Sequence, residues 1–131
     1  MAGEAILVVD DNPANARLIS FLLEKRGYEV RTAIDARDAL QLLNGFQPRL
    51  IMMDLQLPGM DGLELTRRLK ANEKTRDIVV IALTAYAMKG DDERAREAGC
   101  DGYVTKPIDT RTLPDVVAQH LGPPEGGLEG G

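Results

Sequence analysis

Residues 50–54, Leu-Ile-Met-Met-Asp, place one acidic side chain, Asp54, directly after four apolar residues. Pro48 precedes this run and Pro58-Gly59 follows it, so the run is typical of a short strand buried on both faces of a sheet. Burying a carboxylate without a partner costs several kcal/mol of effective desolvation energy. We therefore expect Asp54 at the C-terminal end of the strand, half out of the sheet, with a cationic group beside it.

The composition is that of a single globular domain. The 131 residues are 44% hydrophobic and 28% charged, which allows a core of ordinary size without disulfides. The net charge is -5 and the basic residues are scattered, which argues against direct DNA binding. Cys100 is the single cysteine, expected to be buried, and no segment resembles a signal peptide or a membrane span. The sequence thus predicts a cytoplasmic protein that does not contact membranes.

Strand-like and helix-like segments alternate five times along the chain. The strand candidates are residues 6–9, 28–33, 50–53, 78–83 and 102–105. Helix candidates follow each of them, starting near residues 13, 36, 62, 91 and 112. Buried strands joined by helical crossovers indicate an α/β fold, a five-stranded parallel sheet with helices on both faces.

Local signals predict how some of these helices begin and which side faces inward. Asp35 is a candidate N-cap, and Thr112 with Asp115 has the spacing of a capping box. The helix from residue 36 should turn Leu40 inward together with its alanines. The helix from residue 62 should turn Lys70 outward into solvent.

Two segments carry weak packing signals. From Ala85 to about Gly90 we expect irregular structure, with a short and thinly packed helix from Asp91. Residues 122–131 are rich in Gly and Pro and have no core-forming pattern. The expected domain therefore spans residues 1–121, and residues 122–131 form a flexible tail.

Unusual polar residues follow four of the five predicted strands. They are Asp10, Asp11, Asp54, Thr84 and Lys106. In a parallel α/β sheet the binding crevice lies beyond the carboxyl ends of the strands, so these side chains should converge on one site. Three clustered carboxylates repel one another, and a divalent cation relieves the repulsion. Oxygen ligands without His or Cys favour a hard ion, Mg²⁺ in the first place.

Such a site suits a phosphoryl group, because three acids, one Mg²⁺ and Lys106 leave it formally neutral and able to take an anion. Asp54 is ionised at neutral pH and can attack phosphorus to form an acyl phosphate without a general base. Taken singly, each residue has an ordinary interpretation. Asp10-Asp11 could cap a turn or helix, Thr84 could be a plain strand-end residue, and Lys106 could be solvated. Only their combination indicates a site.

The chain resembles the receiver domain of two-component response regulators from Ile6 to Leu121. The matching motifs are Val-Val-Asp-Asp-Asn at 8–12, Met-Asp-Leu-Gln-Leu-Pro-Gly-Met-Asp-Gly at 53–62, Leu-Thr-Ala at 83–85 and Tyr-Val-Thr-Lys-Pro at 103–107. Residues 84–94 and 98–100 are especially similar to single-domain regulators of the DivK type and to receivers of hybrid kinases. The resemblance implies a flavodoxin-like (βα)5 fold with strand order 2-1-3-4-5.

The resemblance also implies a role for each matching residue. Asp54 would accept a phosphoryl group from a histidine kinase or a histidine phosphotransfer protein. Mg²⁺ would be bound by Asp10, Asp11, Asp54 and the backbone carbonyl of Gln56. The phosphoryl-binding and switch residues would be Thr84, Ala85, Tyr103 and Lys106.

Further expectations concern the surroundings of the site. The Lys106-Pro107 bond should be cis. Gln56 and Tyr86 should flank the phosphoryl group and control how readily water reaches it. His120, the only histidine, should be partly exposed and should not carry phosphate.

In function, such a receiver catalyses only its own phosphoryl transfer and dephosphorylation, and phosphorylation switches a surface that binds a downstream protein target. That surface is expected on the last two helices and the last strand. The same residues would also suit a receiver cut from a hybrid histidine kinase.

Two other classes fit less well. A phosphohydrolase of the haloacid dehalogenase type uses an Asp-x-Asp motif, whereas Gln56 stands where its second acid would be. A phosphorylation-independent scaffold would not need the acids, Thr84 and Lys106 together. A flavin module would find few aromatic side chains to stack on, at 4% with no Trp.

Overall fold

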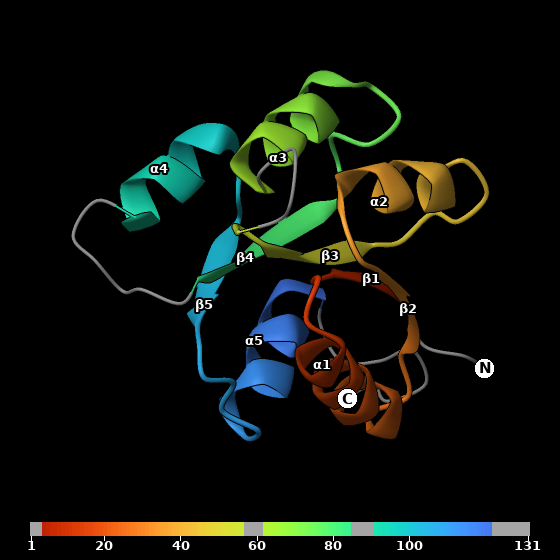
Figure 1. Cartoon of the computed structure of the whole chain (residues 1–131), viewed down its shortest axis with the longest axis vertical. Coiled ribbons are helices and arrows are strands. Elements are labelled where there is room, and N and C mark those ends of the chain that lie inside the picture. The colour runs from red at the N-terminus through yellow and green to blue at the C-terminus, as the bar shows by residue number, and fades with distance from the viewer. Residues whose placement is uncertain (1–3, 57–61, 85–90, 122–131) are drawn as a thin grey trace.

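The computed structural model of the chain describes residues 4–56, 62–84 and 91–121 (Figure 1). Ala85, Tyr86, the expected irregular segment and the expected tail lie outside these residues. The elements in chain order are β1 (Ala5–Val9), α1 (Pro13–Lys25), β2 (Glu29–Ala33), α2 (Ala36–Leu43), β3 (Leu50–Asp54), α3 (Gly62–Ala71), β4 (Val79–Thr84), α4 (Asp91–Ala98), β5 (Gly102–Thr105) and α5 (Thr112–Leu121).

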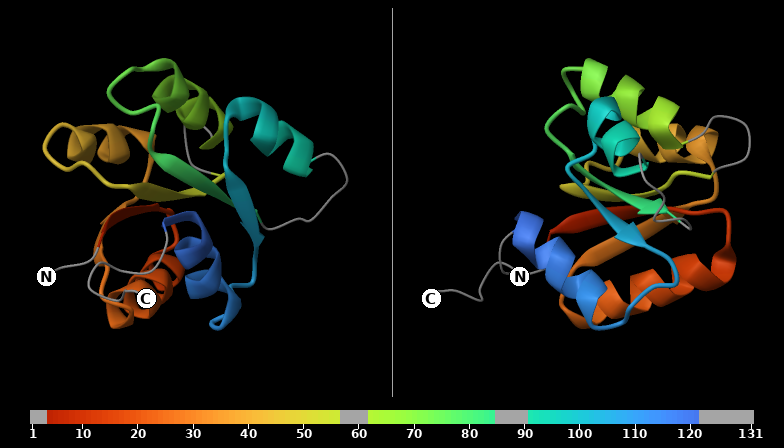
Figure 2. Two further views of the ribbon diagram at one scale, coloured as in Figure 1. Left: turned by 180° about the vertical axis from the view of Figure 1, so that it is seen from behind. Right: turned by 90° about the vertical axis from the view of Figure 1, so that its left-hand side faces the viewer.

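The five strands form one parallel sheet in the order β2-β1-β3-β4-β5, which confirms the expected fold. Helices α1 and α5 cover one face, and α2, α3 and α4 cover the other (Figures 1 and 2). The chain leaves β1 toward one edge of the sheet and returns to β3 to build the other. The carboxyl ends of β1 and β3 therefore meet at the topological switch point, where such sheets bind ligands.

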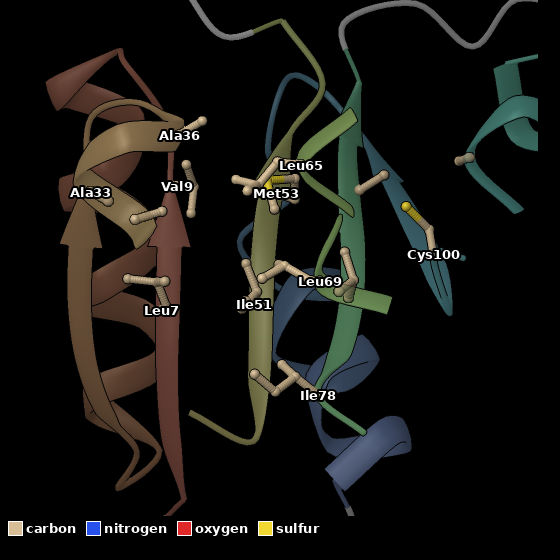
Figure 3. Close-up of a cluster of buried hydrophobic side chains, with 14 of the residues drawn as sticks. Leu7, Val9, Ala33, Ala36, Ile51, Met53, Leu65, Leu69, Ile78 and Cys100 are labelled. Atoms are coloured by element: carbon tan, nitrogen blue, oxygen red, sulfur yellow. The ribbon is translucent and has the colours of Figure 1, made fainter. Parts of the chain in front are cut away.

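Strand β3 is buried along its whole length, as its apolar run predicts. Alternate side chains enter the two layers because successive residues of a strand point to opposite faces. Figure 3 shows Ile51 and Met53 on the side of α3, beside Leu65 and Leu69. Leu50 and Met52 pack into the other layer, with α1 and α5. Full burial of one such side chain stabilises the fold by about 1.5–3 kcal/mol.

Two expectations about which way helix side chains face are wrong, one for Leu40 and one for Lys70. Leu40 is 37% exposed, because the short helix α2 packs through Ala36 and Ala39, with Leu43 partly buried. Lys70 does not point freely into solvent. Its side chain is 21% exposed, and its Nζ donates hydrogen bonds to backbone and carboxylate oxygens near the start of β4.

The helix starts are largely as predicted. Asp35 caps α2 by accepting a hydrogen bond from the backbone N–H of Asp38 at 2.8 Å. The capping box expected at the start of α5 is wrong. Asp109, three residues before Thr112, accepts from the N–H of Arg111 at 2.9 Å and of Thr112 at 3.2 Å. These bonds hold the pKa of Asp109 below its usual value.

Other side chains behave as expected. Cys100 is buried, and this burial raises the pKa of its thiol. His120 is partly exposed. Among the described residues, none of the helices combines the length and apolar character needed to cross a bilayer.

Candidate functional site

The structure brings the three predicted acids together at the carboxyl end of the sheet. One carboxylate oxygen from each of Asp10, Asp11 and Asp54 lies within 4.8 Å of the other two. Val9 pairs with Met53 across the β1–β3 ladder, so the residues that follow them, Asp10 and Asp54, end up level with each other. Asp11, by contrast, is exposed.

Lys106 supplies the expected cationic partner. Its Nζ lies 3.2 Å from Oδ2 of Asp54 and 3.6 Å from Oδ2 of Asp10. The lysine follows β5, and its backbone N–H donates to the carbonyl of Thr84 at 2.7 Å. The Lys106-Pro107 bond is cis, as expected. The ammonium group is thus directed back over the sheet toward Asp54.

Asp54 is more deeply placed than predicted. It ends β3, but only 2% of the residue is exposed, so the expectation that it stands half out of the sheet is wrong. Its Oδ1 accepts from the N–H of Gln56 at 3.0 Å, and its Oδ2 pairs with Lys106. These partners satisfy the carboxylate and allow it to be buried.

Asp10 is held in place but incompletely satisfied. Its Oδ1 accepts from the N–H of Asn12 at 2.9 Å, while the buried Oδ2 accepts no hydrogen bond. Burial raises the pKa of Asp10, and the charge of Asp54 raises it further, although the Asn12 hydrogen bond and Lys106 oppose both effects. The ionised form of Asp10 is therefore less favoured than that of an Asp in water, chiefly because the residue is buried.

These features fit a hard divalent cation. The site offers carboxylate oxygens from three residues, a buried oxygen without a hydrogen bond and a carboxylate whose ionised form is disfavoured. A divalent ion would satisfy the free oxygen and offset the repulsion, and oxygen ligands are those that Mg²⁺ prefers. The position of the Gln56 carbonyl relative to the acids stays a prediction.

The remaining site residues lie on the two neighbouring strands. Thr84 ends β4 and is 5% exposed, one residue beyond Leu83, the ladder partner of Asp54. Tyr103 lies on β5 opposite Ala82 and is 43% exposed. Ala85 lies outside the described residues. The geometry thus brings Asp10, Asp11, Asp54 and Lys106 into direct contact range, with Thr84 at the end of the strand that separates β3 from β5.

Gly62, the last residue of the 53–62 motif, has a packing role that its sequence position alone does not indicate. Gly62 begins α3, and a Cβ at this position would overlap the backbone oxygen of Asp54 and lie 2.9 Å from Cα of Leu55. Its own N–H donates to the carbonyl of Leu55 at 3.2 Å. The helix is therefore packed directly onto the backbone that carries Asp54.

Comparisons with known proteins show to which family the chain belongs. The model of the response regulator receiver domain matches residues 6–118. The chain belongs to this family. As a receiver domain, it is 43% identical over 119 residues to the polar-differentiation response regulator DivK of Brucella ovis. The aligned region covers 91% of this chain and 97% of that relative.

Solved receiver structures agree with the fold. The chemotaxis response regulator CheY4 of Vibrio cholerae is similar with a TM-score of 0.86 and 26% identity, over 92% of this receiver and 100% of that chain. The receiver domain of a sensor histidine kinase from Pseudomonas aeruginosa PAO1 is similar with a TM-score of 0.83 and 36% identity, over 92% of this chain and 99% of that chain. In that structure a magnesium ion is coordinated in the active site cleft. The chain is thus a receiver domain of two-component signalling.

Proposed function

We propose that Asp54 is the residue of this receiver that becomes phosphorylated, with a histidine kinase or a histidine phosphotransfer protein as donor. One observation carries the proposal: Asp54 ends the central strand, buried, with the ammonium group of Lys106 at 3.2 Å. One carboxylate oxygen of Asp54 attacks phosphorus and forms an acyl phosphate. The phosphorus–nitrogen bond of the donor breaks, and the bonding electrons return to its imidazole.

Lys106 contributes by charge. In the resting site it pairs with Asp54 and lies near Asp10, and it can shift to an oxygen of the phosphoryl group as negative charge gathers there. Asp10, Asp11, Asp54 and the Gln56 carbonyl would hold Mg²⁺. When bound, the metal supplies positive charge that stabilises the phosphoryl oxygens.

The switch follows from residues on β4 and β5. Thr84, at the end of β4, would donate a hydrogen bond to the phosphoryl group, with the backbone of Ala85 beside it. Tyr103 is exposed in this structure and would turn inward behind Thr84. The resulting change would appear on the surface of α4, β5 and α5, where a downstream protein target binds. Two states within a few kcal/mol of each other suffice for such a switch.

The proposed catalysis is limited to the protein's own phosphoryl transfer and dephosphorylation. The proposed setting is the cytoplasm, with protein partners and without direct contact to DNA or membranes. The net charge of -5 supports the exclusion of DNA, since phosphate contacts require basic surfaces.

A second candidate setting is a receiver within a hybrid histidine kinase. The 36% identity to the receiver of a sensor histidine kinase favours it, beside the 43% identity to DivK. Both settings use the same chemistry at Asp54 and differ in the donor.

The test is phosphorylation by acetyl phosphate in the presence of Mg²⁺, measured by intact mass. We expect a gain of one phosphoryl group that is stable in acid, labile in base, abolished by chelator and absent from Asp54→Asn. A gain of the same size in Asp54→Asn, or one that is indifferent to chelator, contradicts the proposal.

A further inference from the structure

The strand that leads to Lys106 is thinly packed. Of the four residues of β5, only Val104 is buried. The strand lies at the edge of the sheet and, within the described part of the chain, pairs only with β4. Because little apolar surface holds it, polar contacts at its ends have a large share in fixing its position.

At its N-terminal end, β5 is tied to α3 and β4 through Asp101. The backbone N–H of Asp101 donates to the carbonyl of Val80 at 2.7 Å. Its Oδ2 accepts from the N–H of Val80 at 2.9 Å and from Nζ of Lys70 at 3.1 Å. The carboxylate therefore joins the start of β5 to both neighbours at once.

Lys70 is fully engaged in this junction. Besides Asp101, its Nζ donates to the carbonyl of Ile78 at 2.7 Å and of Arg76 at 3.2 Å. An ammonium group has three N–H donors, and all three have an acceptor here. Lys70 thus links the last turn of α3 to the start of β4 and the start of β5.

The turn before β5 is shaped around the stem of Lys70. Gly99 has a φ of +108°, and a Cβ there would lie 2.7 Å from Cγ of Lys70. One turn earlier in α3, Oγ1 of Thr66 accepts a weak hydrogen bond from the thiol of Cys100 at 3.9 Å. Residues 99–101 therefore rest on α3 over two of its turns.

The other end of α3 lies against the phosphorylation site. Gly62 packs on the backbone of Asp54, and its carbonyl accepts a hydrogen bond from Oγ1 of Thr66 at 2.8 Å. One helix thus joins the backbone of the proposed acceptor to the start of the strand that precedes Lys106.

We propose that Lys70 and Asp101 are positioning residues for phosphoryl transfer. By fixing the start of β5 on α3, they set where the ammonium group of Lys106 lies relative to Asp54, without touching the reacting atoms. The inference rests on the proposed function of Asp54. Misplacement of a charged group by about 1 Å can cost up to about a hundredfold in rate, so a modest shift of β5 suffices for a measurable effect.

The test compares Lys70→Met and Asp101→Asn with wild type in phosphorylation by acetyl phosphate at a series of Mg²⁺ concentrations. Lys70→Met keeps the stem that packs on Gly99 and removes the donors, and Asp101→Asn removes the charge while keeping an acceptor for Val80. The matched control is Arg49→Met, which breaks an ion pair to Glu4 of 3.0 Å at the same end of the sheet, away from β5. Thermal unfolding establishes that each variant is folded at the assay temperature, and Asp101→Asn carries the test if Lys70→Met does not fold.

We expect the maximal rate to fall about tenfold in each variant and no further in the double variant, since both changes break one connection. The half-saturating Mg²⁺ concentration should not rise, because neither residue approaches the acids and a displaced Lys106 would leave Asp10 and Asp54 with less positive charge beside them. Arg49→Met should remain within about twofold of wild type. Rates equal to those of Arg49→Met, or a half-saturating Mg²⁺ concentration that rises enough to account for the loss of rate, overturn the inference. If wild type itself acquires no phosphoryl group at Asp54, the proposed function has failed, and the inference falls with it.

Discussion

Replacing Asp10 with Asn should stabilise the metal-free protein. Asn keeps the shape and the oxygen that accepts from the N–H of Asn12, but it removes the charge of a buried carboxylate. One carboxylate oxygen from each of the three acids lies within 4.8 Å of the others, and with an effective dielectric constant of about 20 the repulsion between unit charges at this limiting distance is about 3.5 kcal/mol. The attraction to Lys106 at 3.6 Å is about 4.6 kcal/mol on the same scale.

These two interactions nearly cancel, so the cost of removing the Asp10 carboxylate from water remains largely uncompensated. This cost is several kcal/mol for a buried ion. We therefore expect Asp10→Asn to raise the free energy of unfolding by about 1–3 kcal/mol in the presence of chelator. For a domain of this size, that corresponds to about 3–5 °C in Tm for each kcal/mol.

The effect should depend on pH in a defined direction. The pKa of Asp10 is raised in the folded protein, chiefly by burial, so protonated Asp10 favours the folded state relative to ionised Asp10. This stability is fully present below the unfolded pKa, about 3.9, and is lost as pH rises through the folded pKa. The advantage of Asp10→Asn should therefore be small in acid and reach its full size above the folded pKa.

The assay is thermal or urea unfolding with chelator and with Mg²⁺, beside the control Asp11→Asn. Asp11 is exposed, so its replacement should change metal-free stability by less than about 0.5 kcal/mol. Wild type should gain about 1.4 kcal/mol at a Mg²⁺ concentration ten times its Kd, and Asp10→Asn should gain little. An Asp10→Asn protein that is less stable than wild type in chelator would refute the reasoning, because attraction to Lys106 would then dominate.

Three further predictions concern other parts of the chain. Gly62→Ala should destabilise the protein by about 1–3 kcal/mol, because the added methyl group overlaps the backbone of Asp54. Gly45→Ala should not, because a Cβ at that position has no atom within 4 Å, and urea unfolding of the two variants checks the difference. Asp35→Ala should cost about 1 kcal/mol through loss of the α2 cap, and Asp35→Asn should restore most of it; equal losses in the two would contradict the capping role. Tyr86→Ala should change how long the phosphorylated protein persists after removal of donor, but not how fast it forms; unchanged decay would dispose of this idea.

Much of the fold could be predicted from the sequence because its strands are short apolar runs that end in polar residues. The run ending in Asp54 and the pair Asp10-Asp11 had to lie at the same edge once the sheet was parallel, and the strand order implied by the resemblance to receiver domains made their strands neighbours. Lys106 was expected at the site because it also follows a predicted strand, although a lysine after a strand is ordinary by itself. The structure places it beside Asp54.

What could not be predicted depends on contacts between distant segments. The long side chain of Lys70 can extend into solvent or fold back onto the protein, and helical periodicity does not distinguish the two. Its direction is set by hydrogen bonds to carbonyl groups near β4 and to the carboxylate of Asp101. The cap of α5 by Asp109 was missed because the helix was taken to begin at its Thr-x-x-Asp spacing. The full burial of Asp54 required knowing how closely its neighbours approach.

The uneven burial across the sheet has a consequence for heat and amide exchange. β3 is buried throughout and has a strand on each side, so its amides should exchange with solvent near the rate of global unfolding. β5 has one buried side chain and one neighbour among the described strands, so it should open locally at a lower free energy. Asp54 is thus attached to a central strand that opens late, and Lys106 follows an edge strand that opens earlier. On warming, reactivity toward phosphoryl donors should fade before the circular dichroism signal of the folded chain does.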